Sequence, residues 1–124
     1  YMIKKKNKSI EQELSKYCGD QLEFAEHCGQ IAYHERYNSG KFGSGIYWIK
    51  LCREGTADRM FRINNGHTVW LEIKKSFKEN LTDDQNMFCA IMLSIGDSYY
   101  FISSKEEFWL MFKDFGIEYF EDIR

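Results

Sequence analysis

Charged side chains of both signs lie close together in the segment Gly55–Gln85. Asp58 precedes an apolar stretch, and Glu72 and Lys74 alternate with apolar residues in "VWLEIKK". On a strand, residues 72 and 74 point to the same face and lie roughly 7 Å apart. Two carboxylates in one place suit a hard cation such as Mg²⁺ or Mn²⁺. A neighbouring ammonium group can orient water or stabilise negative charge that develops during a reaction.

The sequence "NNG" between two apolar stretches predicts a β-hairpin, and its loop length decides which residues share a face. A three-residue loop, Asn64–Gly66, sets Met60 opposite Trp70 and Asp58 opposite Glu72. A two-residue turn would mix apolar and charged side chains on both faces, so burial favours the longer loop. One face then carries Asp58, Glu72 and Lys74. The other face collects Ala57, Phe61, Ile63, Val69, Leu71 and Ile73, with Arg59 as the exception.

Short acid–base patterns of this kind also occur on ordinary solvated strands. There, Asp58, Glu72 and Lys74 would form surface ion pairs that contribute little to stability. The pattern alone leaves both interpretations open. A zinc site is disfavoured, because the four cysteines form no C-x-x-C pair and His27–Cys28 has no second pair of ligands in the sequence.

Capping residues and hydrophobic periodicity predict the helices and strands that position these side chains. The middle helix is apolar on nearly all sides, so we expect it to be buried. The three helices run from Ser9 to Gly29, over Asp83–Ile95 and over Ser104–Phe115, with capping boxes at Ser9–Gln12, Thr82–Gln85 and Ser103–Glu106. The strands are Gln30–Tyr37, Ile46–Cys52, Thr56–Ile63, His67–Lys75 and Ser98–Ser103, with a glycine-rich loop at Asn38–Gly45.

The element order is therefore α-β-β-β-β-α-β-α, which predicts an α/β (α+β) domain with a mixed β-sheet flanked by helices. The strand–helix–strand unit over 67–103 is a crossover and predicts a parallel pair of strands. A chain of 124 residues, 44% of them hydrophobic, is expected to form one domain over 1–124. The net charge of −2 confines any nucleic-acid contact to local patches. The basic arm at 1–8 is either a solvated end or a phosphate contact.

No apolar run is long enough to cross a membrane, and no signal-peptide pattern is found. We therefore expect a cytoplasmic protein without a membrane partner. Its cysteines are expected to be reduced and mostly buried, because the cytoplasm keeps thiols reduced.

The segment "EGTADRMFRINNGHTVWLEIKK", followed by "LTDDQ", resembles the VRR-NUC domains of the PD-(D/E)XK nuclease superfamily. That family has a G-x-P-D strand, a strand with E-x-K and a helix that starts with L-S/T-x-x-Q. These motifs correspond to Gly55–Asp58, Glu72–Lys74 and Leu81–Gln85, with Ala57 in place of the family proline. The resemblance covers about Ile10–Glu107. It implies a PD-(D/E)XK nuclease-like core, α-β-β-β-α-β, to which our assignment adds one strand.

The resemblance also implies roles for individual residues. Asp58, Glu72 and the backbone carbonyl of Ile73 would bind Mg²⁺ or Mn²⁺. Lys74 would position the attacking water or stabilise the transition state. Gln85 would support the site, or would only complete the capping box of its helix.

The family places a glutamate of its first helix near the metal, and both Glu11 and Glu13 fit this position. Glu11 lies on the same stripe of the helix as Leu14, Cys18 and Leu22, which faces inward. We therefore expect Glu11, rather than Glu13, to reach the site.

Expected DNA contacts come from two segments of the chain. The segment with Arg36, Asn38 and Lys41 resembles the family's arginine strand and its Asn-x-Gly loop, which suits the DNA backbone. The same residues could instead form an ordinary hairpin loop. Lys75 and Lys78 would extend a basic lip beside the acidic site.

Together these expectations describe a metal-dependent DNA endonuclease that hydrolyses phosphodiester bonds, with branched or junction DNA among its expected substrates. Stand-alone members of the family occur in phages and tend to be dimers. We therefore expect a homodimer in a bacterial or phage-infected cell, with the exposed part of Phe108–Phe120 as its interface. Two alternatives stay open: a catalytically inactive nuclease-fold module that binds nucleic acid, and a structural protein with a fortuitous pattern.

Overall fold

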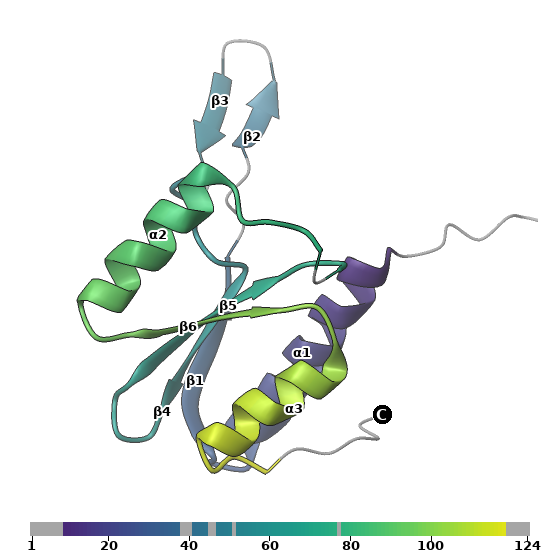
Figure 1. Cartoon of the computed structure of the whole chain (residues 1–124), viewed down its shortest axis with the longest axis vertical. Helices are drawn as coiled ribbons and strands as arrows, with labels where there is room; N and C mark the ends of the chain where they lie inside the picture. Colours follow the sequence, from purple (N-terminus) through teal and green to yellow (C-terminus); the bar gives the residue numbers. More distant parts are fainter. Residues whose placement is uncertain (1–8, 38–40, 45–46, 51, 77, 119–124) are drawn as a thin grey trace, which may run out of the picture.

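The computed structural model describes residues 9–37, 41–44, 47–50, 52–76 and 78–118 (Figure 1). For 41–44 and 47–50 the description covers the backbone alone. None of the helices in the described part of the chain is long and apolar enough to cross a membrane. The elements are α1 (Ile10–His27), β1 (Ile31–Arg36), β2 (Lys41–Ser44), β3 (Tyr47–Lys50), β4 (Arg59–Ile63), β5 (Thr68–Ile73), α2 (Asp83–Ser94), β6 (Ser98–Ile102) and α3 (Lys105–Asp114).

Four strands form the main sheet, in the order β1-β4-β5-β6. β1, β4 and β5 pair in antiparallel fashion, whereas β6 lies parallel to β5. The parallel pair exists because α2 carries the chain from the end of β5 back to the start of β6. The predicted mixed α+β class and the parallel crossover are confirmed.

The predicted number of strands is wrong by one. The expected glycine-rich loop contains β2, which pairs with β3 in a separate two-stranded sheet. The strands of this hairpin pair with each other instead of joining the main sheet, and Figure 1 shows the hairpin extending away from it. The observed order is α-β-β-β-β-β-α-β-α. Glycines at positions 40, 43 and 45 made this segment look like a loop, although short strands tolerate glycine near a turn.

The core lies between the sheet and the helices α1 and α3, which pack side by side (Figure 1). β4 and β5 bury the side chains that were predicted to share one face, and Ile63 packs against them partly buried. Alternation along the strands explains this arrangement, since every second residue points to α1 and α3. The buried residues of this core are Leu14, Cys18, Leu22, Ala25, Ile31, Phe61, Val69, Leu71, Ile73, Ile102, Phe108, Met111, Phe112 and Ile117.

The prediction that the middle helix is buried on all sides is wrong. α2 buries only Phe88, whose ring packs against Trp70 of β5 at a centroid distance of 4.9 Å. Met87, Leu93 and the C-cap residue Ile95 are exposed, with more than half of the surface of each residue accessible to solvent. Their apolar character indicated burial, but α2 has a neighbour on one side only among the described elements.

The helix starts are mostly as predicted. Ser9 and Gln12 form a capping box at α1, and Thr82 and Gln85 form one at α2. α3 begins one position later than expected: the N-cap is Ser104, whose hydroxyl accepts a hydrogen bond from Glu107 N–H at 3.2 Å. Both adjacent serines are followed by a glutamate three residues later, so the sequence pattern could not separate them. The cysteines also differ from expectation, because only Cys18 is buried and Cys28 is exposed.

Candidate functional site

The register of the β4–β5 hairpin brings Asp58 and Glu72 to the same end of the sheet. Met60 lies opposite Trp70, and the ladder ends where Arg59 pairs with Leu71. Gly66 in the loop has a φ of +93°, as a left-handed residue of a three-residue loop requires. The predicted register is therefore confirmed, and the next residues along the two chains are Asp58 and Glu72.

Asp58 is fixed by hydrogen bonds on both sides. Its Oδ2 accepts a hydrogen bond from the N–H of Ile73 at 2.8 Å, and its backbone carbonyl accepts one from Tyr37 N–H at 2.8 Å. The side chain thus lies against the end of β5, while the main chain is tied to the segment that follows β1. These two bonds hold Ile73, the last residue of β5, and Tyr37, the residue after β1, against Asp58.

Glu72 is the most unusual residue of this site. Its side chain is only 2% exposed, and Oε1 has no hydrogen-bond partner among the described residues. Burial, and then the negative charge of Asp58, raise the pKa of the Glu72 carboxyl well above its ordinary value, while Lys74 opposes this shift. A solvated strand face is therefore the wrong interpretation for Glu72, because this carboxyl group is buried and burial of a charged carboxylate costs free energy.

Tyr99 lies beside this carboxylate and was not identified from the sequence. It is paired with Trp70 across the β5–β6 ladder, and its hydroxyl is buried beside the Glu72 carboxyl. Burial, followed by the negative charge of Glu72, raises the pKa of the Tyr99 hydroxyl. Nothing in "SYYFIS" distinguishes this tyrosine from an ordinary strand residue, so only the register of β6 could have revealed it.

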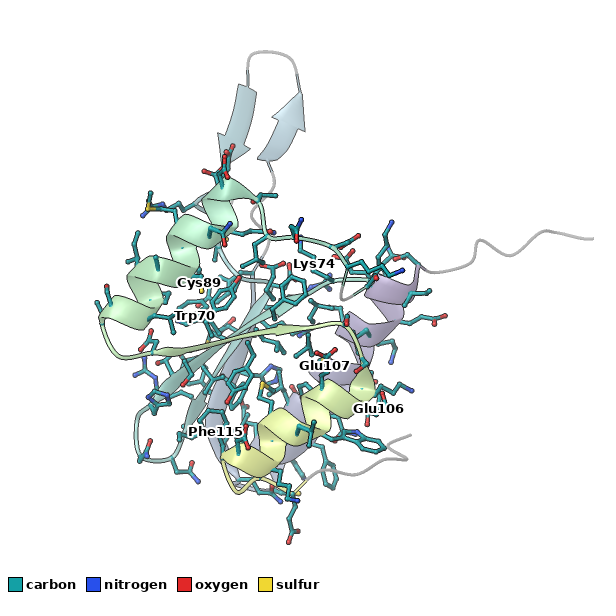
Figure 2. All side chains as sticks on the ribbon, in the orientation of Figure 1. Trp70, Lys74, Cys89, Glu106, Glu107 and Phe115 are labelled. Carbon is teal, nitrogen blue, oxygen red and sulfur yellow. The ribbon has the colours of Figure 1, made fainter. Side chains whose placement is uncertain are left out.

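Lys74 follows β5 directly and is half-buried. It lies on the side of the molecule where α1 begins (Figure 2). Its backbone N–H donates to the carbonyl of Ile102 at 2.9 Å, which fixes the main chain at this point. Its ammonium group lowers the pKa of both Glu72 and Glu11, although burial raises both more strongly. Lys74 is therefore close enough to act on two carboxylates of the site.

The first turn of α1 brings Glu11, not Glu13, to the site. Glu11 lines a cleft together with Asp58, whereas Glu13 lines a different groove with Leu14 and Lys105. Burial, then the negative charges of Asp58 and Glu79, raise the pKa of the Glu11 carboxyl. The structure thus agrees with the choice of Glu11 from the inward stripe of the helix.

The cleft has a volume of about 400 Å³ and contains both acidic and basic groups. Arg36, one of the predicted phosphate contacts, lies on its wall. Tyr37 and Ser15 also line it and were not identified from the sequence. The full lining is Ser9, Glu11, Gln12, Ser15, Arg36, Tyr37, Asp58 and Ile73.

The remaining predicted residues lie at other places. Gln85 completes the capping box of α2, where its Oε1 accepts from Thr82 N–H at 2.9 Å, and it does not line the cleft. Lys75 is exposed and lies 3.7 Å from a carboxylate oxygen of Glu79. Lys78 is exposed, and its backbone N–H donates to Ser76. Asn38 and the basic arm at 1–8 are outside the described residues, as is the side chain of Lys41.

A glycine in the loop before Asp58 allows this loop to pack closely against the start of α2. Gly55 has a φ of +87°, and a side chain at this position would collide with the backbone carbonyl of Asp84. The loop before Asp58 therefore packs directly against the first turn of α2. This contact explains why a glycine lies three residues before Asp58 and how the two motifs come together.

Arg59, the predicted exception on the apolar face, is also buried, with 6% of its surface exposed. Its guanidinium lies over Gly19 of α1, where a Cβ atom would be only 2.8 Å from Nη2. Nε and Nη2 donate to Ser15 Oγ at 3.4 and 3.3 Å. Burial, and then the positive charge of Arg36, lower the pKa of Arg59. Gly19 therefore has a packing role that its position in mid-helix did not reveal.

The donor set can be compared with what a hard cation needs. Within the described residues, no three His, Cys, Asp or Glu side chains are close enough together to hold a metal ion by themselves. The site instead offers the carboxylates of Asp58 and Glu72. Oε1 of Glu72, which is buried and without a partner, is the donor that a cation would use. This all-oxygen set fits Mg²⁺ or Mn²⁺ better than zinc.

Comparisons with models of protein families, with curated proteins and with solved structures each found no match. What the site does must therefore be inferred from its residues and their geometry. Those residues are two carboxylates, of which one is buried, and a lysine and a further glutamate whose charges act on them.

Proposed function

We propose that the chain is a Mg²⁺- or Mn²⁺-dependent endodeoxyribonuclease of the PD-(D/E)XK type, which hydrolyses phosphodiester bonds in DNA, branched DNA included. The observation that carries this proposal is the buried Glu72 carboxyl, whose Oε1 has no partner among the described residues and which lies beside Asp58. Two carboxylates in such a place repel each other and lose hydration, which a divalent cation would offset.

Asp58 and Glu72 would hold the cation with their side chains, and Ile73 with its backbone carbonyl. A bound cation of this kind supplies positive charge to a phosphoryl group and lowers the pKa of water. Asp58 is already oriented by the N–H of Ile73, so part of the donor set is fixed before any ligand binds. Such preorganisation reduces the reorganisation that the reaction itself requires.

Lys74 and Glu11 supply the remaining chemistry. The ammonium group of Lys74 would stabilise the negative charge that develops on the phosphoryl oxygens. Glu11 lines the cleft, and its raised pKa makes the carboxylate a stronger base toward a proton of the attacking water. Gln85 would act indirectly, because its capping box fixes the start of α2, which packs on the loop before Asp58.

Two substitutions separate the roles of Glu72 and Lys74. Glu72→Gln removes a charged ligand, so both Mn²⁺ affinity and DNA cleavage should fall. Lys74→Met removes a cation that binds no metal, so Mn²⁺ affinity should persist or increase. The cleavage rate of this variant should still fall. The loss should be roughly 10²-fold if the ammonium group of Lys74 stabilises charge in the transition state as such groups do in other enzymes.

The measurements are calorimetric titration with Mn²⁺ and a nicking assay on plasmid and branched DNA. Lys105→Met serves as a matched control, because this lysine lies on α3 and should leave both quantities unchanged. A Lys74→Met protein that cuts at the wild-type rate would disprove the mechanism. Binding of DNA without any cleavage by the wild type would instead establish the inactive binding module.

A further inference from the structure

Arg59 is a buried cation that has no ion pair among the described residues. Only 6% of it is exposed, and the two hydrogen bonds of its guanidinium both go to the Ser15 hydroxyl. The charges of Asp58 and Asp20 act on the guanidinium, but neither carboxylate forms an ion pair with it, and a single hydroxyl acceptor cannot fully offset the burial of its charge. An anion that binds nearby would therefore stabilise the buried arginine further.

Ser15 connects this buried charge to the cleft. Its oxygen accepts from two nitrogens of Arg59, so its own hydrogen is left to donate. No acceptor for that hydrogen is found in the described part of the chain, and Ser15 lines the cleft. A hydroxyl that accepts from a guanidinium is a stronger donor, because chains of hydrogen bonds polarise one another.

The surroundings of Ser15 suit an anion rather than a second cation. Arg36 lines the same cleft and is paired with Arg59 across the β1–β4 ladder, so two arginines lie on neighbouring strands. The positive charge of Arg36 also contributes to the lowered pKa of Arg59. Glu11 and Asp58 line the same cleft.

The cleft therefore combines two carboxylates with an arginine and a hydroxyl. A phosphodiester backbone can use both kinds of group, if one phosphate takes part in the reaction at the carboxylates and a neighbouring phosphate contacts Ser15 and Arg36. Backbone phosphates are commonly bound by arginine and serine side chains.

We infer that Ser15 and Arg36 bind a non-bridging oxygen of a DNA backbone phosphate, next to the phosphate that is cleaved. Arg59 is a positioning residue: it orients and polarises the Ser15 hydroxyl, and its buried guanidinium adds positive charge behind this hydroxyl. This inference rests on the proposed function, because it names how the same cleft holds its substrate.

The test uses binding without cleavage. A fluorescein-labelled thymidine decanucleotide is titrated with the full chain in EDTA, and binding is followed by fluorescence anisotropy. Ser15→Ala should weaken binding roughly tenfold to hundredfold, as expected for loss of one hydrogen bond to a charged group. Ser15→Thr should restore it, because threonine keeps the hydroxyl.

Salt dependence separates the two contacts. Arg36→Gln should reduce the slope of log K against log salt by about 0.7, the value for one phosphate contact with a single strand. Ser15→Ala should leave this slope unchanged, since serine carries no charge. Arg62→Gln is the matched control: this arginine is exposed on β4 of the same sheet, does not line the cleft and should bind nearly as wild type.

Arg59→Met should weaken binding at least as much as Ser15→Ala, and the double variant should bind no more weakly than Arg59→Met alone. Should Arg59→Met fail to fold, Ser15→Ala and its threonine rescue still decide the question.

Binding in EDTA that depends on Ser15 supports the inference even if the wild type never cuts DNA, in which case only the proposed function fails. The inference is overturned if Ser15→Ala binds as wild type, or if the wild type does not bind the oligonucleotide at all. Cleavage that persists in either case would leave the proposed function standing.

Discussion

Glu72 lies on the less apolar face of β5, yet its side chain is almost as buried as the leucines of the core. The sequence predicted that Asp58, Glu72 and Lys74 share a face, because only one hairpin register sorts apolar from charged residues. It did not predict that Glu72 is covered. Alternation along a strand says which side a residue faces, whereas Tyr99, which lies beside Glu72, comes from a strand distant in sequence.

We predict that replacing Glu72 stabilises the protein without metal, in a pH-dependent way. The pKa of Glu72 is raised on folding, so its contribution to stability is present below its unfolded pKa and is lost as the pH rises toward the folded one. In EDTA, Glu72→Gln should therefore increase the free energy of unfolding by roughly 1–3 kcal/mol at pH 8. The difference should shrink toward pH 5. Urea unfolding across this range measures it.

Addition of Mn²⁺ provides the internal control for this prediction. A cation that binds the ionised carboxylates stabilises the folded state. Wild type at pH 8 should then gain stability, and Glu72→Gln should gain much less. A Glu72→Gln protein that is less stable than wild type at pH 8 in EDTA would show that the carboxylate has a partner it needs.

Glu11 and Glu13 offer a matched pair of substitutions in the first turn of α1. Both carboxylates interact with the helix dipole to a similar extent, so loss of either should affect the helix alike. Only Glu11 lines the cleft with Asp58. Glu11→Gln should lower the rate of plasmid nicking by roughly 10²-fold, if this group takes a proton in the reaction. Glu13→Gln should cut at the wild-type rate, and equal losses in both variants would contradict the assignment.

At the scale of elements, the helix starts could be predicted because capping is local: Ser9 with Gln12 and Thr82 with Gln85 need only four residues each. The contacts between elements could not. Gly19 in mid-helix and Gly55 before Asp58 both look like simple breaks in the sequence, yet each provides space for a group far along the chain, Arg59 and Asp84 respectively. The first strand of the hairpin β2–β3 was not predicted because its glycines indicated a loop, although glycine content alone does not exclude a strand.

Gly55 allows the packing of two elements to be measured. Gly55→Ala combines a positive φ with a collision against the carbonyl of Asp84, so we expect a loss of roughly 3–5 kcal/mol from backbone strain plus overpacking. Gly29→Ala has a comparable φ of +77° but nothing within 4 Å of the added carbon. It should cost only about 1–2 kcal/mol, the strain of the left-handed conformation. Urea unfolding gives both values, and equal losses would mean that the α2 contact is unimportant.

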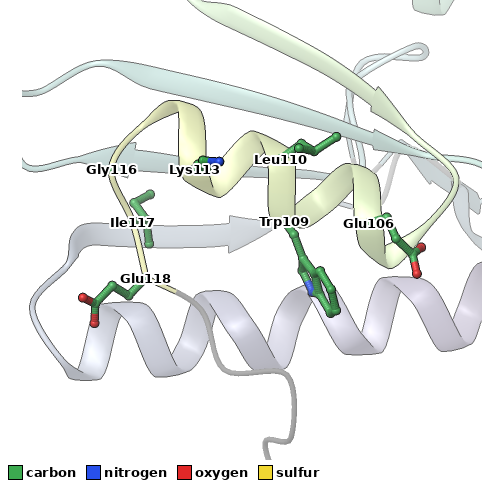
Figure 3. Close-up of a pocket in the computed structure, with 7 residues that line it drawn as sticks. All are labelled: Glu106, Trp109, Leu110, Lys113, Gly116, Ile117 and Glu118. Carbon is green, nitrogen blue, oxygen red and sulfur yellow. The ribbon is translucent and has the colours of Figure 1, made fainter.

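At the scale of the whole molecule, the sequence predicted the right fold class but placed the exposed apolar surface wrongly. Only the exposed part of the aromatic segment Phe108–Phe120 was expected to form a dimer interface, and within the described residues Phe108 and Phe112 belong to the core. Trp109 of α3 points toward α1, where its Nε1 donates to Tyr17 Oη at 2.7 Å (Figure 3). Leu110 is the exposed large apolar residue that α3 retains. Hydrophobicity indicates that a residue tends to be covered, but not whether its own chain covers it.

The helix that was expected to be buried is the better candidate for an interface. α2 exposes Met87 and Leu93, and Ile95 follows at its C-cap; these lie on one element, whereas Leu110 lies on another. Exposed apolar residues that gather on one element mark interaction surfaces more often than scattered ones do. A second copy of the chain is the partner that needs no other component, because a two-fold axis pairs one element with the same element of the second copy.

We therefore predict a homodimer that forms through α2, not through α3. Light scattering at micromolar concentration should give twice the monomer mass for the wild type. Leu93→Glu should give the monomer mass, because it places a charge in the apolar contact at a side chain that is 53% exposed and not needed for the core. Leu110→Glu, at a side chain that is 62% exposed on α3, should remain dimeric. The reverse result would return the interface to α3, and a monomeric wild type would contradict a homodimer through either helix.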